Sequence, residues 1–142
     1  MAPMNMEPAD PPMLSETELR EQYANLQQRA LNLGSDAQSR IDQLTAAMQL
    51  PPTQHTDAYL HALQGATDDA RVAVLSYRRG LPFVETANSL IESLAKPSPS
   101  ADEEEEWREQ LLFRLAEVLE MGADLIAEGE AHLERSARAE IE

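Results

Sequence analysis

Apolar residues recur at steps of three and four residues through the first third of the chain. The series consists of Leu19, Tyr23, Leu26, Ala30, Leu33, Ala37, Ile41, Leu44 and Met48. This spacing places all of these side chains on one side of an α-helix. The pattern therefore predicts one long helix over residues 15–49, roughly 50 Å long at about 1.5 Å per residue. Pro51 and Pro52 end it, because proline lacks the N–H that a helix interior requires.

Three features agree on where this helix begins. Ser15 is a candidate N-cap, and Glu18 stands three residues later, at the spacing of a capping box. Leu14 and Leu19 flank the cap at the positions of a hydrophobic staple. The start at Ser15 is thus the best-marked boundary in the sequence.

Gly34 is a candidate break inside the first helix. It could close one helix while Ser35 or Asp36 caps another. Against this, the apolar series passes from Leu33 to Ala37 without losing phase, and an interior glycine costs only about 1 kcal/mol. We therefore expect a continuous helix with a weak point near Gly34.

Two more helices are predicted in the middle of the chain. The first spans residues 54–79, and its apolar face is formed by Leu60, Leu63, Thr67, Ala70, Val74 and Tyr77. The second spans residues 83–96 and has a shorter face of Val84, Ala87, Ile91 and Leu94. Between them, Gly80-Leu81-Pro82 is typical of a helix stop followed by a proline in the first turn of the next helix.

A fourth helix is predicted over residues 101–135, after a linker at residues 97–100. Ser100 and Glu103 repeat the capping-box spacing at its start. Its apolar positions are Trp107, Leu111, Leu112, Leu115, Val118, Leu119, Leu125, Ile126 and Leu133. This stripe is wider than a two-stranded coiled coil uses, so the helix is expected to touch more than one neighbour.

These elements predict an all-α fold: an elongated antiparallel bundle of about four helices, two long, one medium and one short, with a partner chain as a way to complete it. The step from Ala37 to Ile41 departs from a strict heptad, which favours a bundle over a coiled coil. We assign residues 14–138 to a single helical domain. Residues 1–13 are expected to be a disordered tail because they are proline-rich and aperiodic, and residues 139–142 are expected to fray.

The net charge of the chain limits the classes of partner that it is expected to bind. The 142-residue chain has a net charge of −15. Residues 1–96 hold 12 acids and 7 bases, a net of −5, and residues 97–142 hold 14 and 4, a net of −10. Such a surface repels nucleic acid, which is bound by clustered Lys and Arg, and is compatible with basic protein partners or with a homo-oligomer.

The chain offers little for covalent or metal chemistry. It has no cysteine, and its three histidines are accompanied by no Glu-x-x-His pair of the kind that di-iron bundles use. No glycine-rich phosphate loop or nucleophile elbow is present. We expect neither catalysis nor a metal or cofactor. Without a signal peptide or a long apolar run, we expect an intracellular protein, cytoplasmic or nuclear, with no membrane association.

The strongest charge feature is an acidic run at the start of the predicted fourth helix. It consists of Glu103, Glu104, Glu105 and Glu106. Carboxylates in a first turn are stabilised by the helix dipole, which explains the run without any function. The functional alternative is a docking surface for a basic partner. Phosphorylation of Ser98 or Ser100, just upstream, would add to the negative charge.

Four further residues are candidates for protein interaction. Tyr77, Arg78 and Arg79 form the only basic cluster, which a helix C-terminus would favour and which could also pair with the acidic run within the chain. Trp107, the only tryptophan, is either a core residue or an interface anchor.

The sequence favours a non-catalytic interaction protein, a structural or adaptor subunit of a larger assembly. The alternative is a small acidic regulator or chaperone that masks a basic surface of a partner protein. A carboxylate metalloenzyme is the third possibility, and the missing ligand pairs count against it.

Overall fold

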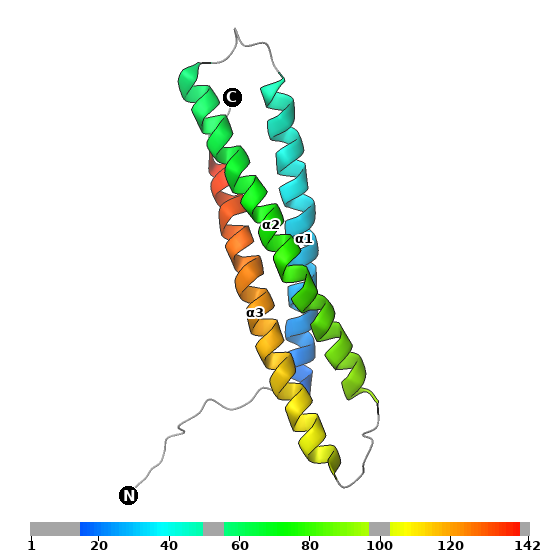
Figure 1. Cartoon of the computed structure of the whole chain (residues 1–142). Coiled ribbons are helices and arrows are strands. Elements are labelled where there is room, and N and C mark those ends of the chain that lie inside the picture. The colour runs from blue at the N-terminus through cyan, green and yellow to red at the C-terminus, as the bar shows by residue number, and fades with distance from the viewer. Residues whose placement is uncertain (1–14, 50–55, 97–102, 140–142) are drawn as a thin grey trace, which may run out of the picture.

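The computed structural model describes residues 15–49, 56–96 and 103–139, and these residues form three α-helices and no strand. The helices are α1 (Glu16–Met48), α2 (Asp57–Leu94) and α3 (Glu104–Arg138). They pack side by side into an elongated bundle in which α2 runs antiparallel to both α1 and α3 (Figure 1). The all-α bundle expected from the periodicity is confirmed. In the described part of the chain, no helix has an apolar stretch long enough to cross a membrane.

The first helix begins and continues as predicted. The Glu18 N–H donates to Ser15 Oγ at 3.2 Å, and the Ser15 N–H donates to Glu18 Oε1 at 3.3 Å, which completes the capping box. The helix then runs through Gly34 without interruption, because the apolar face on either side of Gly34 stays in phase against α2 and α3.

The prediction of two separate helices over residues 54–79 and 83–96 is wrong, and with it the count of four. One continuous helix, α2, runs through Gly80 and Pro82. Gly80 has no left-handed conformation. It is instead buried against α3, where an added Cβ would lie 2.9 Å from Ile126 Cδ1. The glycine therefore marks a close helix contact, and the packing of α2 on α3 offsets the backbone hydrogen bond that Pro82 cannot make.

Replacing Pro82 with alanine is expected to raise the free energy of unfolding by about 1–2 kcal/mol. Proline in a helix interior costs about 3 kcal/mol relative to alanine, and part of that gain is lost because proline also restricts the unfolded chain. Pro82 is exposed, so the change disturbs no packing. Urea denaturation measures the effect. A loss of stability would indicate instead that Pro82 starts a separate helix.

The predicted fourth helix is α3, which packs most extensively on α2 and less on α1, so the expected contact with two neighbours is confirmed. The main core lies where all three helices meet. A smaller apolar cluster lies nearer the α1–α2 connection and is formed by Leu44, Leu63, Ala66 and Ala70. The predicted tail at 1–13, the linker at 97–100, Ser98 and Ser100 lie outside the described residues.

Candidate functional site

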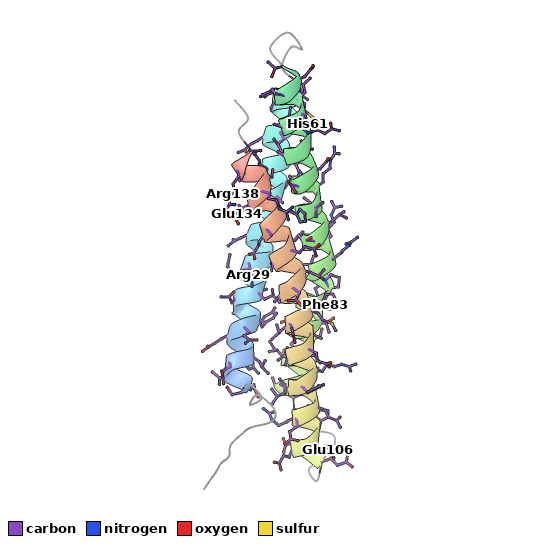
Figure 2. The ribbon with its side chains drawn as sticks, turned by 90° about the vertical axis from the view of Figure 1, so that its left-hand side faces the viewer. Arg29, His61, Phe83, Glu106, Glu134 and Arg138 are labelled. Atoms are coloured by element: carbon purple, nitrogen blue, oxygen red, sulfur yellow. The ribbon has the colours of Figure 1, made fainter. Side chains whose placement is uncertain are left out.

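The acidic run lies at the very start of α3, as Figure 2 shows for Glu106. Glu103 is the N-cap residue and makes no side-chain cap hydrogen bond, and the three glutamates after it occupy the first helical turn. All four side chains are exposed. Their placement matches stabilisation by the helix dipole and leaves their carboxylates open to solvent.

Trp107 follows the acidic run and is half-buried. It lines a small surface hollow together with Glu103, Glu106 and Gln110. Its side chain is thus neither a fully buried core residue nor a fully exposed anchor.

Arg108, which the sequence did not single out, connects all three helices at this end of the bundle. Its Nη1 donates to the Leu94 carbonyl at the end of α2 at 3.0 Å, and its Nη2 pairs with Glu16 Oε1 at the start of α1. A cation beside the last carbonyls of a helix also complements the helix dipole. Only the tertiary fold could reveal this role, because Glu16 and Arg108 lie 92 residues apart.

Tyr77 packs inside the bundle, whereas the two arginines that follow it in the chain are exposed. Its ring is half-buried and covers Gly34 of α1, where an added Cβ would lie 2.8 Å from ring atoms Cε1 and Cζ. The glycine that looked like a weak point in α1 is therefore the surface on which this ring packs. Tyr77 is a bundle contact rather than part of an exposed basic cluster.

Arg78 and Arg79 are exposed, and neither forms an ion pair within the described ranges. The suggested pairing with the acidic run is not present. Arg79 lies 15 residues before Leu94, the end of α2, which places it roughly 20 Å along α2 from the end that Arg108 of α3 contacts.

An ion pair joins α1 to α3 in the middle of the bundle. Arg29 Nε donates to Glu130 Oε2 at 3.2 Å, and Arg29 Nη2 contacts Glu130 Oε1 at 2.5 Å. The hydrogen bond with Glu130 raises the pKa of the Arg29 guanidinium, partial burial opposes that shift, and the carboxylate charge adds to it. The positive charge of Arg29 is therefore already balanced by a carboxylate of its own chain.

A second polar contact lies near the C-terminus of α3. Ser136 is fully buried, and its Oγ donates to the Ala66 carbonyl of α2 at 2.8 Å. The same Oγ accepts from Arg40 Nε of α1 at 3.0 Å. His132 of α3 also contacts Asp69 of α2, with Nδ1 and Oδ1 2.9 Å apart. These contacts fix the register of the three helices.

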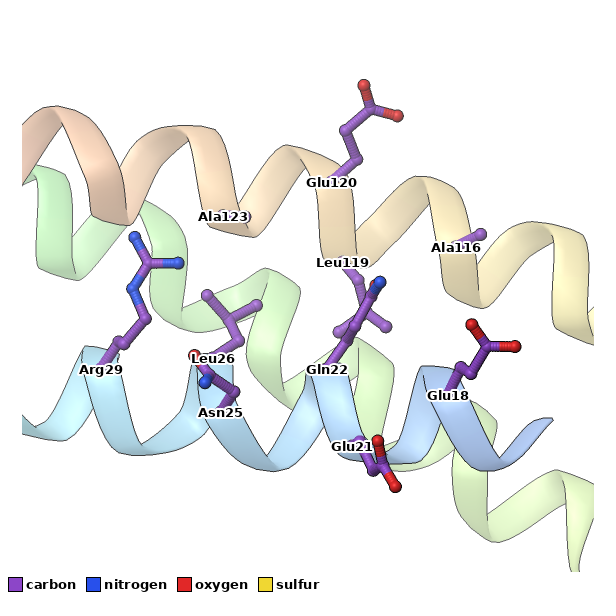
Figure 3. A pocket seen from close by; sticks show the side chains of 10 residues that line it. All are labelled: Glu18, Glu21, Gln22, Asn25, Leu26, Arg29, Ala116, Leu119, Glu120 and Ala123. Carbon is purple, nitrogen blue, oxygen red and sulfur yellow. The ribbon is translucent and has the colours of Figure 1, made fainter. Parts of the chain in front are cut away.

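A groove of about 700 Å³ lies along the seam between α1 and α3, where the helices pack least extensively (Figure 3). The residues that line it are Glu18, Glu21, Gln22, Asn25, Leu26, Arg29, Ala116, Leu119, Glu120 and Ala123. Leu26 and Leu119 are buried and form the floor. The wall on α3 is low because Ala116 and Ala123 are small.

The groove carries excess negative charge. Glu18 and Glu21 contribute carboxylates from α1, and Glu120 contributes one from α3. Arg29, the one base among the described residues of the lining, is paired with Glu130. An apolar floor with carboxylates at both edges suits a ligand that is apolar on one side and cationic at its margins.

No group of three or more His, Asp or Glu side chains that could hold a metal occurs among residues 15–49, 56–96 and 103–139. Comparisons of the chain with models of protein families, with curated proteins and with solved structures gave no match.

Proposed function

We propose that the protein is a non-catalytic helical binding protein, an adaptor or structural subunit that holds a partner protein in the groove between α1 and α3. The observation that supports this proposal is the groove itself, with its buried leucine floor and its carboxylate edges. Protein interfaces typically combine an apolar centre with a polar rim. The candidates from the sequence, Trp107 and the acidic run, lie at one end of α3 and would extend such an interface.

A large side chain placed in the groove is expected to prevent the partner from binding. In Ala123→Trp, a bulky side chain occupies the low wall on α3, whereas Ala24→Trp places the same side chain on an exposed position of α1 outside the groove lining. Each variant and the wild-type chain are purified under native conditions, and the mass and composition of the complex are measured.

We expect the wild-type chain and Ala24→Trp to retain the same partner, and Ala123→Trp to lose at least about nine-tenths of it, a tenfold effect that corresponds to about 1.4 kcal/mol. Thermal melting of the free chains checks that both variants stay folded. Equal retention by the two variants would contradict a role for the groove, and a bare monomer from the wild type would contradict the adaptor function.

The alternative function, an acidic regulator that masks a basic surface, is supported by the charges of α3. Of its ten carboxylates, only those of Glu130 and Glu134 form ion pairs within the described residues. The other eight carboxylates are exposed and are thus available to a basic partner. Retention that falls steeply as salt is raised would favour this alternative, because salt screens exposed charges over about 10 Å.

A further inference from the structure

We infer that the occupant of the groove is an amphipathic α-helix of the partner, with a small apolar face, lysine or arginine on both flanks, and a direction antiparallel to α1 and α3. This inference rests on the proposed function and specifies the partner's chemistry.

The charge of the occupant follows from the carboxylates at the groove edges. Glu21 and Glu120 are exposed and form no ion pair in the described part of the chain. Glu18 is exposed as well, although one of its oxygens accepts from Ser15. Because Arg29 is held by Glu130, none of the described residues that line the groove balances these charges. Cations on both flanks of an occupant would face a carboxylate from each helix.

The shape of the occupant follows from the floor and the low wall. Ala116 and Ala123 lie seven residues, or two helical turns, apart on α3, and both are half-buried. Small side chains at this spacing allow the ridge of another helix to approach closely. On α1 the lining extends from Glu18 to Arg29, a length of roughly 16 Å. Three helical turns of an occupant span that distance.

The direction of the occupant follows from the topology. α1 and α3 run parallel, and α2, which is antiparallel to both, crosses behind the groove (Figures 1 and 3). A helix in the groove would face two parallel macrodipoles, which favours the opposite direction. With an antiparallel occupant, the assembly becomes a four-helix bundle with alternating neighbours.

Fluorescence anisotropy with a labelled peptide tests the inference. The probe is an 18-residue helical peptide with leucine and alanine on one face and lysine on both flanks, and a matched peptide carries glutamate instead of lysine. The proteins are the full chain, the groove variant Glu21→Lys/Glu120→Lys, and the control variant Glu85→Lys/Glu92→Lys. The control makes the same change of charge at exposed positions of α2.

We expect the groove variant to bind the lysine peptide at least about tenfold more weakly than the wild type, and the control variant to change affinity by less than about threefold. The glutamate peptide should not bind. Equal weakening in both variants would overturn the inference, since the overall negative field and not the groove would then hold the peptide.

A spin label at the peptide N-terminus tests the direction. An antiparallel helix should broaden amide NMR signals near Arg29 and Ala123, and broadening near Glu18 and Ala116 instead would overturn the assigned direction. If the lysine peptide does not bind in the groove while Ala123→Trp still loses the native partner, the inferred occupant is wrong and the proposed binding function stands. If Ala123→Trp also keeps its partner, both proposals fail.

Discussion

Replacing Leu115 with alanine is expected to lower the free energy of unfolding by about 2–5 kcal/mol. Leu115 of α3 is 0% exposed and belongs to the core that all three helices share. The substitution removes buried methyl groups and leaves a cavity that the surrounding helices fill only in part. Urea denaturation followed by circular dichroism measures the loss. An unchanged m-value would show that unfolding exposes the same amount of surface in the variant and in the wild type.

Phe113 provides the matched control for this substitution, since it lies two residues earlier on the same helix and is 56% exposed. Phe113→Ala removes a larger side chain but creates no cavity, so we expect a change within about 0.5 kcal/mol. A loss comparable to that of Leu115→Ala would show that Phe113 is covered in solution, and would contradict the helix orientation described above.

Replacing Gly129 with leucine is expected to lower the free energy of unfolding by about 3 kcal/mol. Gly129 of α3 is buried against both α1 and α2, and an added Cβ would lie 2.7 Å from Leu33 Cδ2 and 2.8 Å from Ser76 Cβ. Leu33 could move, but Ser76 Cβ is held by the backbone of α2, so the helices themselves must separate. The higher helix propensity of leucine recovers less than about 1 kcal/mol.

Gly65 is the control position because an added Cβ there would have no neighbour within 4 Å. Gly65→Leu therefore keeps only the gain in helix propensity, and we expect a stabilisation of about 0.5–1 kcal/mol. Thermal and urea denaturation should thus shift in opposite directions for the two glycine variants. A shift in the same direction would contradict the close contact of α1, α2 and α3 at Gly129.

The periodicity of the sequence predicted which residues form helices, but it did not predict that α2 continues through Gly80 and Pro82. Gly80 and Pro82 are helix-terminating residues in isolation, and the local sequence offers no contrary signal. Gly80 lies against Ile126, which is 46 residues later in the chain. Gly80 is therefore a site of helix packing and does not end a helix. The local rule failed because tertiary packing supplied more free energy than the interrupted hydrogen bond cost.

The candidate site was less predictable than the fold. The sequence identified the acidity of the chain and singled out Trp107 and the acidic run, both at one end of α3. It did not identify the groove, whose walls come from residues about 100 positions apart in the chain. Ala116 carries no distinctive local pattern, and the charge of Arg29 could not be recognised as balanced before Glu130 was placed beside it.

The sequence by itself determined the helical class, the start of α1 at Ser15 and the negative charge, because these depend on the composition or on residues within four positions of one another. The tertiary structure alone decided that Gly80 and Pro82 lie inside one helix, that Tyr77 covers Gly34, and that a charged groove lies along the seam between α1 and α3. These features depend on contacts between helices, whose free energies are absent from any single stretch of the chain.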